Sequence, residues 1–494
     1  MSNVFANVLR NEETHKRTEN GAEAFNTTNS GLVDLFGTIG SLRSRNDDEI
    51  ARIFANAYNE DALRATKIAF YARDIREGCG ERETFRSILK YLAKKHPEAL
   101  KNNLDLIGVF GRYDDLYSLI GTPLESDMWT AMKKQFEEDL ANMKAGHNVS
   151  LLAKWVKTPD ASSENTRALG IKTAKALGYS VYDFKRKLRE LRKHIGVIER
   201  YMSAKEWDKI TYSEVPSRAM MIYRNAFARN DAERFQAFKD SLIKGETKIN
   251  ASTLYPYDLV EKVLYGDEDN TILNAQWDAM PDFVNSENNA IVVADVSGSM
   301  TGRPMATSIG LAMYFAERNH GDFNGLFMTF SDDPEIQKVK GKTLYEKVCN
   351  LEKADWGGST NFEAIFDKLL DMAIRNNISQ DDMVKSIIVV TDMEFNEANY
   401  NYNYGRRTSD WGFYNQMVKK YHDAGYEIPN IVFWNVNARN DTFHSQADVP
   451  GVQMVSGQAV ATFKYVMKAV GMTAYEMMLE VVDSDRYAAI TIAS

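Results

Sequence analysis

The stretch Ile291-Val-Val-Ala-Asp-Val-Ser-Gly-Ser-Met300 decides how the C-terminal half of this chain is interpreted. The β-branched run Ile291 to Val293 predicts a buried strand. Asp295, Ser297 and Ser299 follow it at every second position, so their side chains are expected to face one point just past the strand end. Oxygen ligands of this kind suit a hard divalent cation such as Mg²⁺. A solvated turn is the alternative, because Asp and Ser are common in loops.

The sequence beyond this stretch predicts an open α/β sheet with more polar groups at the ends of its strands. Gly325 to Ser331 and Ile387 to Val390 are apolar runs that predict two further strands. Between them lies the loop Trp356-Gly-Gly-Ser-Thr-Asn361, and the second run leads into Thr391 and Asp392. Ligands bind such sheets at the carboxyl ends of the strands. A helix after the loop is indicated by apolar residues spaced three and four apart, which are Phe362, Ile365, Phe366, Leu369 and Leu370.

The order of these groups resembles the metal-ion-dependent adhesion site of von Willebrand factor A domains. That pattern is D-x-S-x-S, then Thr after Gly-Gly, then Asp after an apolar strand. The resemblance implies one bound Mg²⁺ or Mn²⁺, with an open position that a partner's acidic side chain fills. Ser359 beside Thr360 leaves open which hydroxyl reaches the metal. The ligands implied by the resemblance are Asp295, Ser297, Ser299, Thr360 and Asp392.

Composition places the chain among ordinary globular proteins. Its 494 residues suffice for two or three domains, and 44% are hydrophobic while 26% are charged. Cys79 and Cys349 are the two cysteines, which excludes a disulfide framework and fits a reducing compartment. There is no apolar leader and no apolar run of about 18 residues. We therefore expect a cytoplasmic protein with no membrane association.

The distribution of patterns predicts two domains after a polar start. Residues 1–30 are polar and predict a loosely packed arm, and residues 31–285 have helical periodicity almost throughout. Residues 265–290 contain Gly, Asp, Asn and Pro and predict a linker between the halves. Residues 286–494 are expected to form the α/β domain with a mostly parallel, Rossmann-like sheet.

Scattered segments make most of the chain similar to a family that joins a helical module to a von Willebrand A domain. That architecture in turn resembles the Ro autoantigen, in which a ring of helical repeats, the TROVE domain, precedes a von Willebrand A domain. The resemblance implies HEAT-like helical repeats, with a ring as one arrangement, and a non-catalytic RNA-binding role. The implied RNA is either a single-stranded end held in a basic hole or a small structured RNA on the outer surface. The segments are Thr18-Glu-Asn-Gly21, Val33-Asp-Leu-Phe36, Tyr71-Ala-Arg-Asp-Ile-Arg-Glu-Gly-Cys-Gly-Glu-Arg82, Gly111-Arg-Tyr-Asp-Asp-Leu116, Ala153-Lys-Trp155, Val215-Pro-Ser-Arg218, Phe433-Trp-Asn435 and Ser456-Gly457.

Charge is strongly segregated along the chain, which carries a net charge of -9 in total. Residues 151–250 hold 21 Lys and Arg against 12 Asp and Glu, a balance of +9, so the remainder carries -18. A basic segment in an acidic protein is typical of an RNA-binding surface, and Tyr182 and Phe184 beside it could stack on bases. The solvated face of an amphipathic helix is the alternative. The candidate RNA-binding residues are Lys185, Arg186, Lys187, Arg189, Arg192 and Lys193.

Other charged clusters and the search for catalytic motifs suggest structural roles. The cluster from Arg73 to Arg82 predicts an ion-pair network at a helix corner. No H-E-x-x-H or G-x-S-x-G motif occurs, so we expect no enzyme. The sequence thus favours a non-enzymatic RNA-binding scaffold with a divalent-metal site. A metal-dependent protein-interaction module or a structural assembly protein without RNA binding is the alternative.

Overall fold

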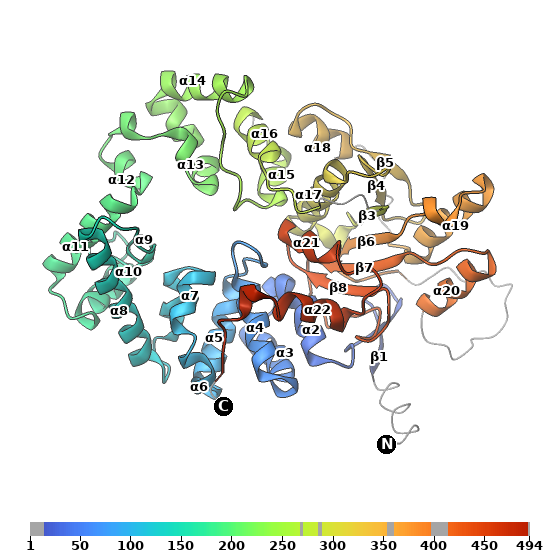
Figure 1. Cartoon of the computed structure of the whole chain (residues 1–494), viewed down its shortest axis with the longest axis horizontal. Helices are drawn as coiled ribbons and strands as arrows, with labels where there is room; N and C mark the ends of the chain where they lie inside the picture. Colours follow the sequence, from blue (N-terminus) through green and yellow to red (C-terminus); the bar gives the residue numbers. More distant parts are fainter. Residues whose placement is uncertain (1–13, 267–269, 285–288, 353–359, 397–412, 493–494) are drawn as a thin grey trace. The chain divides into compact units, whose positions relative to one another are not determined.

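The computed structural model of the chain describes residues 14–266, 270–284, 289–352, 360–396 and 413–492 (Figure 1). These residues belong to two compact units. Unit 1 comprises Met1–Ile68 and Leu254–Ser484, and unit 2 comprises Ala69–Thr253 and Asp485–Ser494. Each unit therefore joins segments that lie far apart in the sequence.

Unit 1 contains a six-stranded sheet with the strand order β5-β4-β3-β6-β7-β8. All neighbouring strands are parallel except β4 and β5, which are antiparallel. The prediction of a mostly parallel sheet after a helical region is thus confirmed. The strands are β3 (Ala290–Ala294), β4 (Leu326–Thr329), β5 (Ile336–Lys338), β6 (Ser386–Thr391), β7 (Asn430–Asn435) and β8 (Val452–Ser456).

The register of β3 and β6 brings the predicted polar groups to one edge of the sheet. Ala294 lies opposite Val390, and the Asp295 backbone N–H donates to the Val390 carbonyl at 3.1 Å. Asp295 and Thr391 therefore follow the two strands at the same level. This is the carboxyl edge, where ligands bind in sheets of this kind.

Helices cover both faces of the sheet because its strands are apolar on both. Ile291 and Val389 pack in one core with α19 (Phe362–Asn376) and α20 (Phe413–Asp423). The apolar face expected for α19 is buried, as its spacing predicts. On the other face the Trp434 ring packs at a tilt against Phe463, which also contacts α17 (Arg303–Arg318). Strands covered on both sides read as continuous apolar runs, which is why these strands could be found in the sequence.

The N-terminal part of unit 1 packs against the sheet half of the chain. α2 (Gly31–Thr38) lies beside β8 (Figure 1). In η1 (Ile39–Ser44), which follows α2, the Gly40 backbone N–H donates to the Ser456 hydroxyl at 2.9 Å. A Cβ at Gly40 would lie 2.6 Å from the Gly457 Cα, so this approach requires glycine. The elements are β1 (His15–Arg17), β2 (Glu23–Phe25), α2 (Gly31–Thr38), η1 (Ile39–Ser44), α3 (Asp47–Glu60) and the start of α4 (Ala62–Arg73).

The predicted polar arm is wrong for residues 14–30, which we call the N-terminal segment. Thr18 is buried, and its hydroxyl donates to the Phe395 carbonyl at 2.6 Å. Phe25 exchanges two backbone hydrogen bonds with Phe443, at 2.8 and 2.9 Å. The polar residues of this segment serve as hydrogen-bond partners for the other half of unit 1 and so do not mark a loose lead-in.

The predicted linker at 265–290 also differs from the structure. It contains α16 (Asn270–Asp278), in which Leu273 and Trp277 are buried. The Trp277 indole N–H donates to Glu317 at 2.7 Å, so the segment is tied to α17. The remaining elements of unit 1 are α15 (Pro256–Leu264), η5 (Gly298–Met300), α18 (Leu344–Glu352), η6 (Gln380–Asp382), η7 (Val460–Thr462), α21 (Phe463–Val466) and α22 (Ala474–Val482).

Unit 2 is helical, as the sequence predicts, whereas HEAT-like repeats and a ring stay predictions. Two long helices show why these residues fold as they do. α5 presents a continuous apolar face, and α11 begins at the Ser180 cap and ends at Gly196 in the left-handed conformation. The elements are the end of α4, α5 (Glu83–Lys95), α6 (Pro97–Lys101), α7 (Leu104–Phe110), η2 (Tyr113–Leu119), α8 (Glu125–Lys144), α9 (Leu152–Trp155), α10 (Glu164–Ala176), α11 (Val181–Ile195), α12 (Ile198–Ser203), η3 (Trp207–Lys209), η4 (Tyr212–Glu214), α13 (Ser217–Asn230), α14 (Ala232–Ile243) and η8 (Asp485–Tyr487).

Candidate functional site

Asp295 lies one residue beyond β3 with its side chain fully buried. Its Oδ2 accepts a hydrogen bond from the Thr391 hydroxyl at 2.7 Å, and its Oδ1 accepts from the Ser297 backbone N–H at 2.9 Å. Burial raises the pKa of Asp295 to about 6, and the charge of Asp392 adds to the rise, although hydrogen bonds from Thr391 and Ser297 oppose it. A cation placed beside this carboxyl group would favour its ionised form.

Ser297 and Ser299 belong to the turn that follows Asp295. Ser297 is half-buried and Ser299 is exposed. Their hydroxyl oxygens lie 3.1 Å apart. The turn thus presents two neighbouring hydroxyl groups to solvent above a buried carboxylate, which is the arrangement that the alternating sequence predicts.

Thr360 and Asp392 are both hydrogen-bonded to Glu394, in the loop that follows β6. The Thr360 hydroxyl donates to the Glu394 carbonyl at 3.3 Å, and the Glu394 backbone N–H donates to Asp392 Oδ1 at 3.3 Å. Thr360 and Asp392 are both buried. Since Thr391 in turn binds Asp295, the structure brings all three predicted loops together. The candidate hydroxyl of Ser359, with Trp356 and the two glycines, lies outside the described residues.

An ion pair that the sequence did not indicate completes this edge of the sheet. Arg439 Nη2 lies 3.0 Å from Asp392 Oδ2, and Arg439 Nη1 lies 3.3 Å from Glu19 Oε2. Glu394 is also buried and accepts the Glu19 backbone N–H at 2.7 Å. No local pattern around Arg439 distinguishes it from an ordinary loop residue, so its role depends on chain segments far away in the sequence.

The chemistry of the donors fits a hard divalent cation. Asp295 and Asp392 supply two buried carboxylates within electrostatic range of one another, and three hydroxyl groups lie on the converging loops. Mg²⁺ and Mn²⁺ prefer oxygen donors of this kind. Within the described ranges no cluster of three or more His, Cys, Asp or Glu side chains suits a metal, so hydroxyl groups would have to complete the ligand set.

Helix α11 carries the candidate RNA-binding residues. Phe184 and Leu188 are buried, whereas Tyr182 is 75% exposed. Arg186, Arg189 and Lys193 are exposed, at spacings of three and four. Positions three and four apart share a helix face, so these cations and Tyr182 line one side of α11. Phe184 is unable to stack on a base because it belongs to the core.

The other candidate cations of α11 are engaged within the protein. Lys185 lies 3.3 Å from Asp160, and Lys187 lies over the Tyr179 ring at 5.3 Å. The Arg192 guanidinium donates to the carbonyls of Ala153 and Val156 at 2.8 and 3.3 Å. Burial lowers the pKa of Arg192. The structure therefore gives Arg192 a role that joins α11 to α9, and its contact with RNA stays a prediction.

The charged cluster near Arg73 forms the ion-pair network that the sequence predicts. Arg73 Nε lies 2.6 Å from Asp115 Oδ2, and Arg86 Nε lies 2.8 Å from Asp115 Oδ1. Asp74 has no exposed surface and receives two hydrogen bonds from Arg486, both at 2.8 Å. All of these residues lie in unit 2, where they fix the helix corner.

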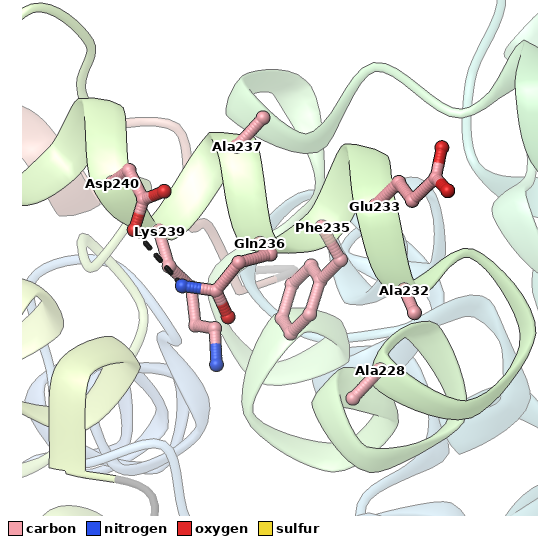
Figure 2. Close-up of a pocket in the computed structure, with 8 residues that line it drawn as sticks. All are labelled: Ala228, Ala232, Glu233, Phe235, Gln236, Ala237, Lys239 and Asp240. Atoms are coloured by element: carbon pink, nitrogen blue, oxygen red, sulfur yellow. Dashed lines mark hydrogen bonds between the residues drawn. The ribbon is translucent and has the colours of Figure 1, made fainter.

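A shallow pocket on α13 and α14 offers no comparable chemistry (Figure 2). Phe235 forms its apolar side, and the Gln236 amide donates to Asp240 Oδ1 at 2.9 Å. Lys239 lies over the Phe235 ring at 5.8 Å. The residues that line the pocket are Ala228, Ala232, Glu233, Phe235, Gln236, Ala237, Lys239 and Asp240, and they include no pair of nucleophile and base.

Comparison with known families assigns both halves of the chain. The domain of unknown function DUF2828 matches residues 18–126 and 113–289, and the domain of unknown function DUF7788 matches residues 289–489. Within the described part of the chain no helix is long and apolar enough to cross a membrane.

Two individual proteins are similar over most of the chain. "Uncharacterized protein L728" of Acanthamoeba polyphaga mimivirus is 30% identical over 511 residues, covering 94% of this chain and 87% of its own length. The crystal structure of the Ro (RSR) protein of Deinococcus radiodurans matches with 13% identity and a TM-score of 0.42, covering 91% of this chain and all of that one.

Proposed function

We propose that this chain, which belongs to the family that joins a DUF2828 domain to a DUF7788 domain, is a non-enzymatic RNA-binding scaffold with a divalent-metal site. The proposal places RNA on the exposed face of α11 and the metal at the Asp295 edge of the sheet. The single observation that carries it is the solvent-facing row of one tyrosine and three cations on α11.

The charge of the surrounding segment supports RNA as the ligand of α11. Residues 151–250 carry a balance of +9 within a chain of net charge -9. Cations that attract phosphates supply most of the sequence-independent binding of nucleic acids. An acidic partner protein would also be attracted, but the exposed ring of Tyr182 adds a surface on which a base can stack.

Under this proposal the exposed cations of α11 bind phosphate groups of the RNA directly. Arg186, Arg189 and Lys193 follow one another at helical spacing and would contact successive phosphates. Arg186 lies 3.2 Å from Asp183, a pair in which both side chains are largely exposed. An exposed pair of this kind contributes little, so phosphate would compete readily for the guanidinium. Lys185 and Lys187 would add to the positive electrostatic potential of this surface without contacting the RNA directly.

Charge reversal tests the RNA proposal. In the variant Arg186→Glu, Arg189→Glu and Lys193→Glu, we expect affinity for single-stranded oligo(U) and for a stem–loop RNA to fall to background. Binding by the wild-type protein should weaken with salt. In the neutral variant Arg186→Gln, Arg189→Gln and Lys193→Gln, which should retain weak binding, the slope of log K against log salt should fall by about 2–3 in magnitude, because each phosphate contact releases counterions. Fluorescence anisotropy across a salt series measures both.

A matched control has the same charge change outside the basic segment. Lys94, Lys95 and Lys144 are exposed residues of unit 2. Their reversal to Glu should leave most of the RNA affinity in place. Equal loss in both variants would show that net charge alone attracts RNA and would overturn the assignment to α11. Salt-independent binding by the wild-type protein would reject the proposal itself.

A metal-dependent protein-interaction module is the second candidate function. The convergence of the Asp295, Thr360 and Asp392 loops favours it. Asp295 and Asp392 would hold the cation with Ser297, Ser299 and Thr360, and the cation would supply a Lewis-acid position for a partner's carboxylate. The protein's own hydroxyl groups and buried carboxylates would select the cation and fix its position.

Removal of one carboxylate tests this second candidate. Full-length protein titrated with Mn²⁺ should take up the ion, as measured by loss of the free-ion signal in electron paramagnetic resonance. Asp295→Ala should abolish the uptake, whereas Asp333→Ala, at a largely exposed carboxylate paired with Lys368, should preserve it. Equal uptake by all three proteins would reject the site. RNA binding by Asp295→Ala should equal that of the wild-type protein.

A further inference from the structure

Arg439 already neutralises one of the carboxylates that the proposed metal would need. Its Nη2 lies 3.0 Å from Asp392 Oδ2. The Asp392 side chain is 1% exposed, whereas the Arg439 side chain is 32% exposed. The guanidinium therefore reaches a buried carboxylate from the solvent side. A divalent cation that binds the same carboxylate would bring a second positive charge close to Arg439.

The guanidinium is held by fewer bonds than it is able to form. Besides Asp392, Arg439 has one other ion pair, with Glu19 at 3.3 Å, among the residues that the structure describes. Its Nε is buried and has no hydrogen-bond partner within the same residues. A guanidinium carries five N–H donors. Among the described residues this guanidinium leaves one buried donor, Nε, unsatisfied, which lowers the free-energy cost of moving it away from Asp392.

Glu19 offers Arg439 a partner that does not depend on Asp392. Glu19 Oε1 accepts a hydrogen bond from the Asn440 side-chain amide at 2.8 Å. The Glu19 backbone N–H donates to Glu394 Oε2 at 2.7 Å, which fixes this part of the N-terminal segment. The carboxylate would therefore stay beside Arg439 when the guanidinium leaves Asp392.

We propose that Arg439 is a built-in competitor for the divalent cation at Asp392, with Glu19 retaining the guanidinium when the cation is bound. The inference rests on the proposed metal site and deepens it, because the exchange sets how tightly that site binds. Without the cation, the Arg439–Asp392 pair compensates the buried carboxylate. With the cation bound, Asp392 is compensated by the metal, and Arg439 gives up Asp392 but keeps its pair with Glu19. The N-terminal segment is thereby part of the metal site's regulation.

Removing the competing charge is the direct test. Full-length Arg439→Gln should bind Mn²⁺ about tenfold more tightly than the wild-type protein, measured by electron paramagnetic resonance and by isothermal titration calorimetry. The matched control is Arg64→Gln, since Arg64 is similarly exposed at 33% and is also paired with two carboxylates, Asp61 and Asp483. Its Mn²⁺ affinity should equal that of the wild-type protein.

A double-mutant cycle tests the role of Glu19. Glu19→Gln should weaken Mn²⁺ binding in the wild-type background, because the displaced guanidinium loses its partner. In the Arg439→Gln background the same change should have little effect. Equal weakening in both backgrounds would show that Glu19 acts on the metal through its own charge and would overturn the exchange.

The outcomes separate this inference from the site on which it rests. Uptake of Mn²⁺ that does not require Asp295 rejects the metal site and the inference together. Uptake that requires Asp295 but is unchanged or weaker in Arg439→Gln keeps the metal site and overturns the inference, because Arg439 would then orient Asp392 for the metal. Thermal unfolding of each variant, followed by circular dichroism, shows whether it retains the fold.

Discussion

Asp34, in the first turn of α2, is a carboxyl group whose ionisation opposes folding. Burial raises its pKa to about 6, although hydrogen bonds from the Thr27 and Thr28 hydroxyls and from the Thr28 backbone oppose the rise. The native state therefore holds a proton between about pH 4 and pH 6 that the unfolded state releases. The stabilisation that this protonated carboxyl group contributes is therefore present at pH 4 and is lost as the pH rises through 6.

Asp34→Asn should remove this pH dependence. The free energy of unfolding of the wild-type protein, minus that of the variant, should fall by on the order of 3 kcal/mol between pH 4 and pH 7. Urea unfolding of both proteins at several pH values measures the difference, and the contributions of other titrating groups cancel in the comparison. Parallel curves for the two proteins would contradict the prediction.

Single residues also show which parts of the site the sequence can predict. The sequence predicts that Asp295, Ser297 and Ser299 lie close together, because their alternation after a strand determines where the side chains point. The sequence also predicts that Phe184 is buried, since it stands four residues before Leu188 on the apolar face of α11. The role of Arg439 is not predictable from the sequence, because its pairing with Asp392 depends on two loops that meet only in the folded chain.

At the scale of elements, the sequence predicts well those segments whose burial follows a simple period. β3 and β6 are buried along their full lengths, and α19 buries residues at helical spacing. The N-terminal segment shows no such period of buried residues, because it is stabilised by hydrogen bonds. The Asn20 amide donates to the Glu394 carbonyl at 2.7 Å, and the Thr18 hydroxyl contacts the neighbouring carbonyl of Phe395. Polar residues that satisfy distant backbone groups have the same composition as a loose arm.

At the scale of the whole molecule, the last ten residues belong to the helical unit. Tyr487 is fully buried and stacks on Phe110, and Asn103 exchanges hydrogen bonds with the Thr491 backbone at 2.5 and 3.1 Å. Arg486 compensates the buried charge of Asp74. This chain end is thus a structural part of unit 2.

Arg486→Ala should therefore destabilise unit 2 selectively. Arg486 is 25% exposed but Asp74 is fully buried, so removing the guanidinium should cost on the order of 3 kcal/mol, because the carboxylate loses its counter-ion while it keeps hydrogen bonds from Tyr487 and the Arg76 backbone. Hydrogen exchange read by mass spectrometry should show faster exchange across Ala69–Thr253 and little change across Leu254–Ser484. Glu480→Ala, at an exposed position of α22, is the control and should change neither region. Uniform acceleration in both regions would contradict independent stabilities.

The discontinuity of both units has a consequence for how the protein is made. Residues 14–60 leave the ribosome early, but the strands they pack against in unit 1 begin only at Ala290. Translating Ala69–Thr253 takes on the order of 10–40 s at typical rates. During that interval the apolar side of α2 has no strand to cover it. Unit 2, in turn, is incomplete until Arg486 and Tyr487 have been translated, so we expect chaperones to shield α2 and the surroundings of Asp74 during synthesis.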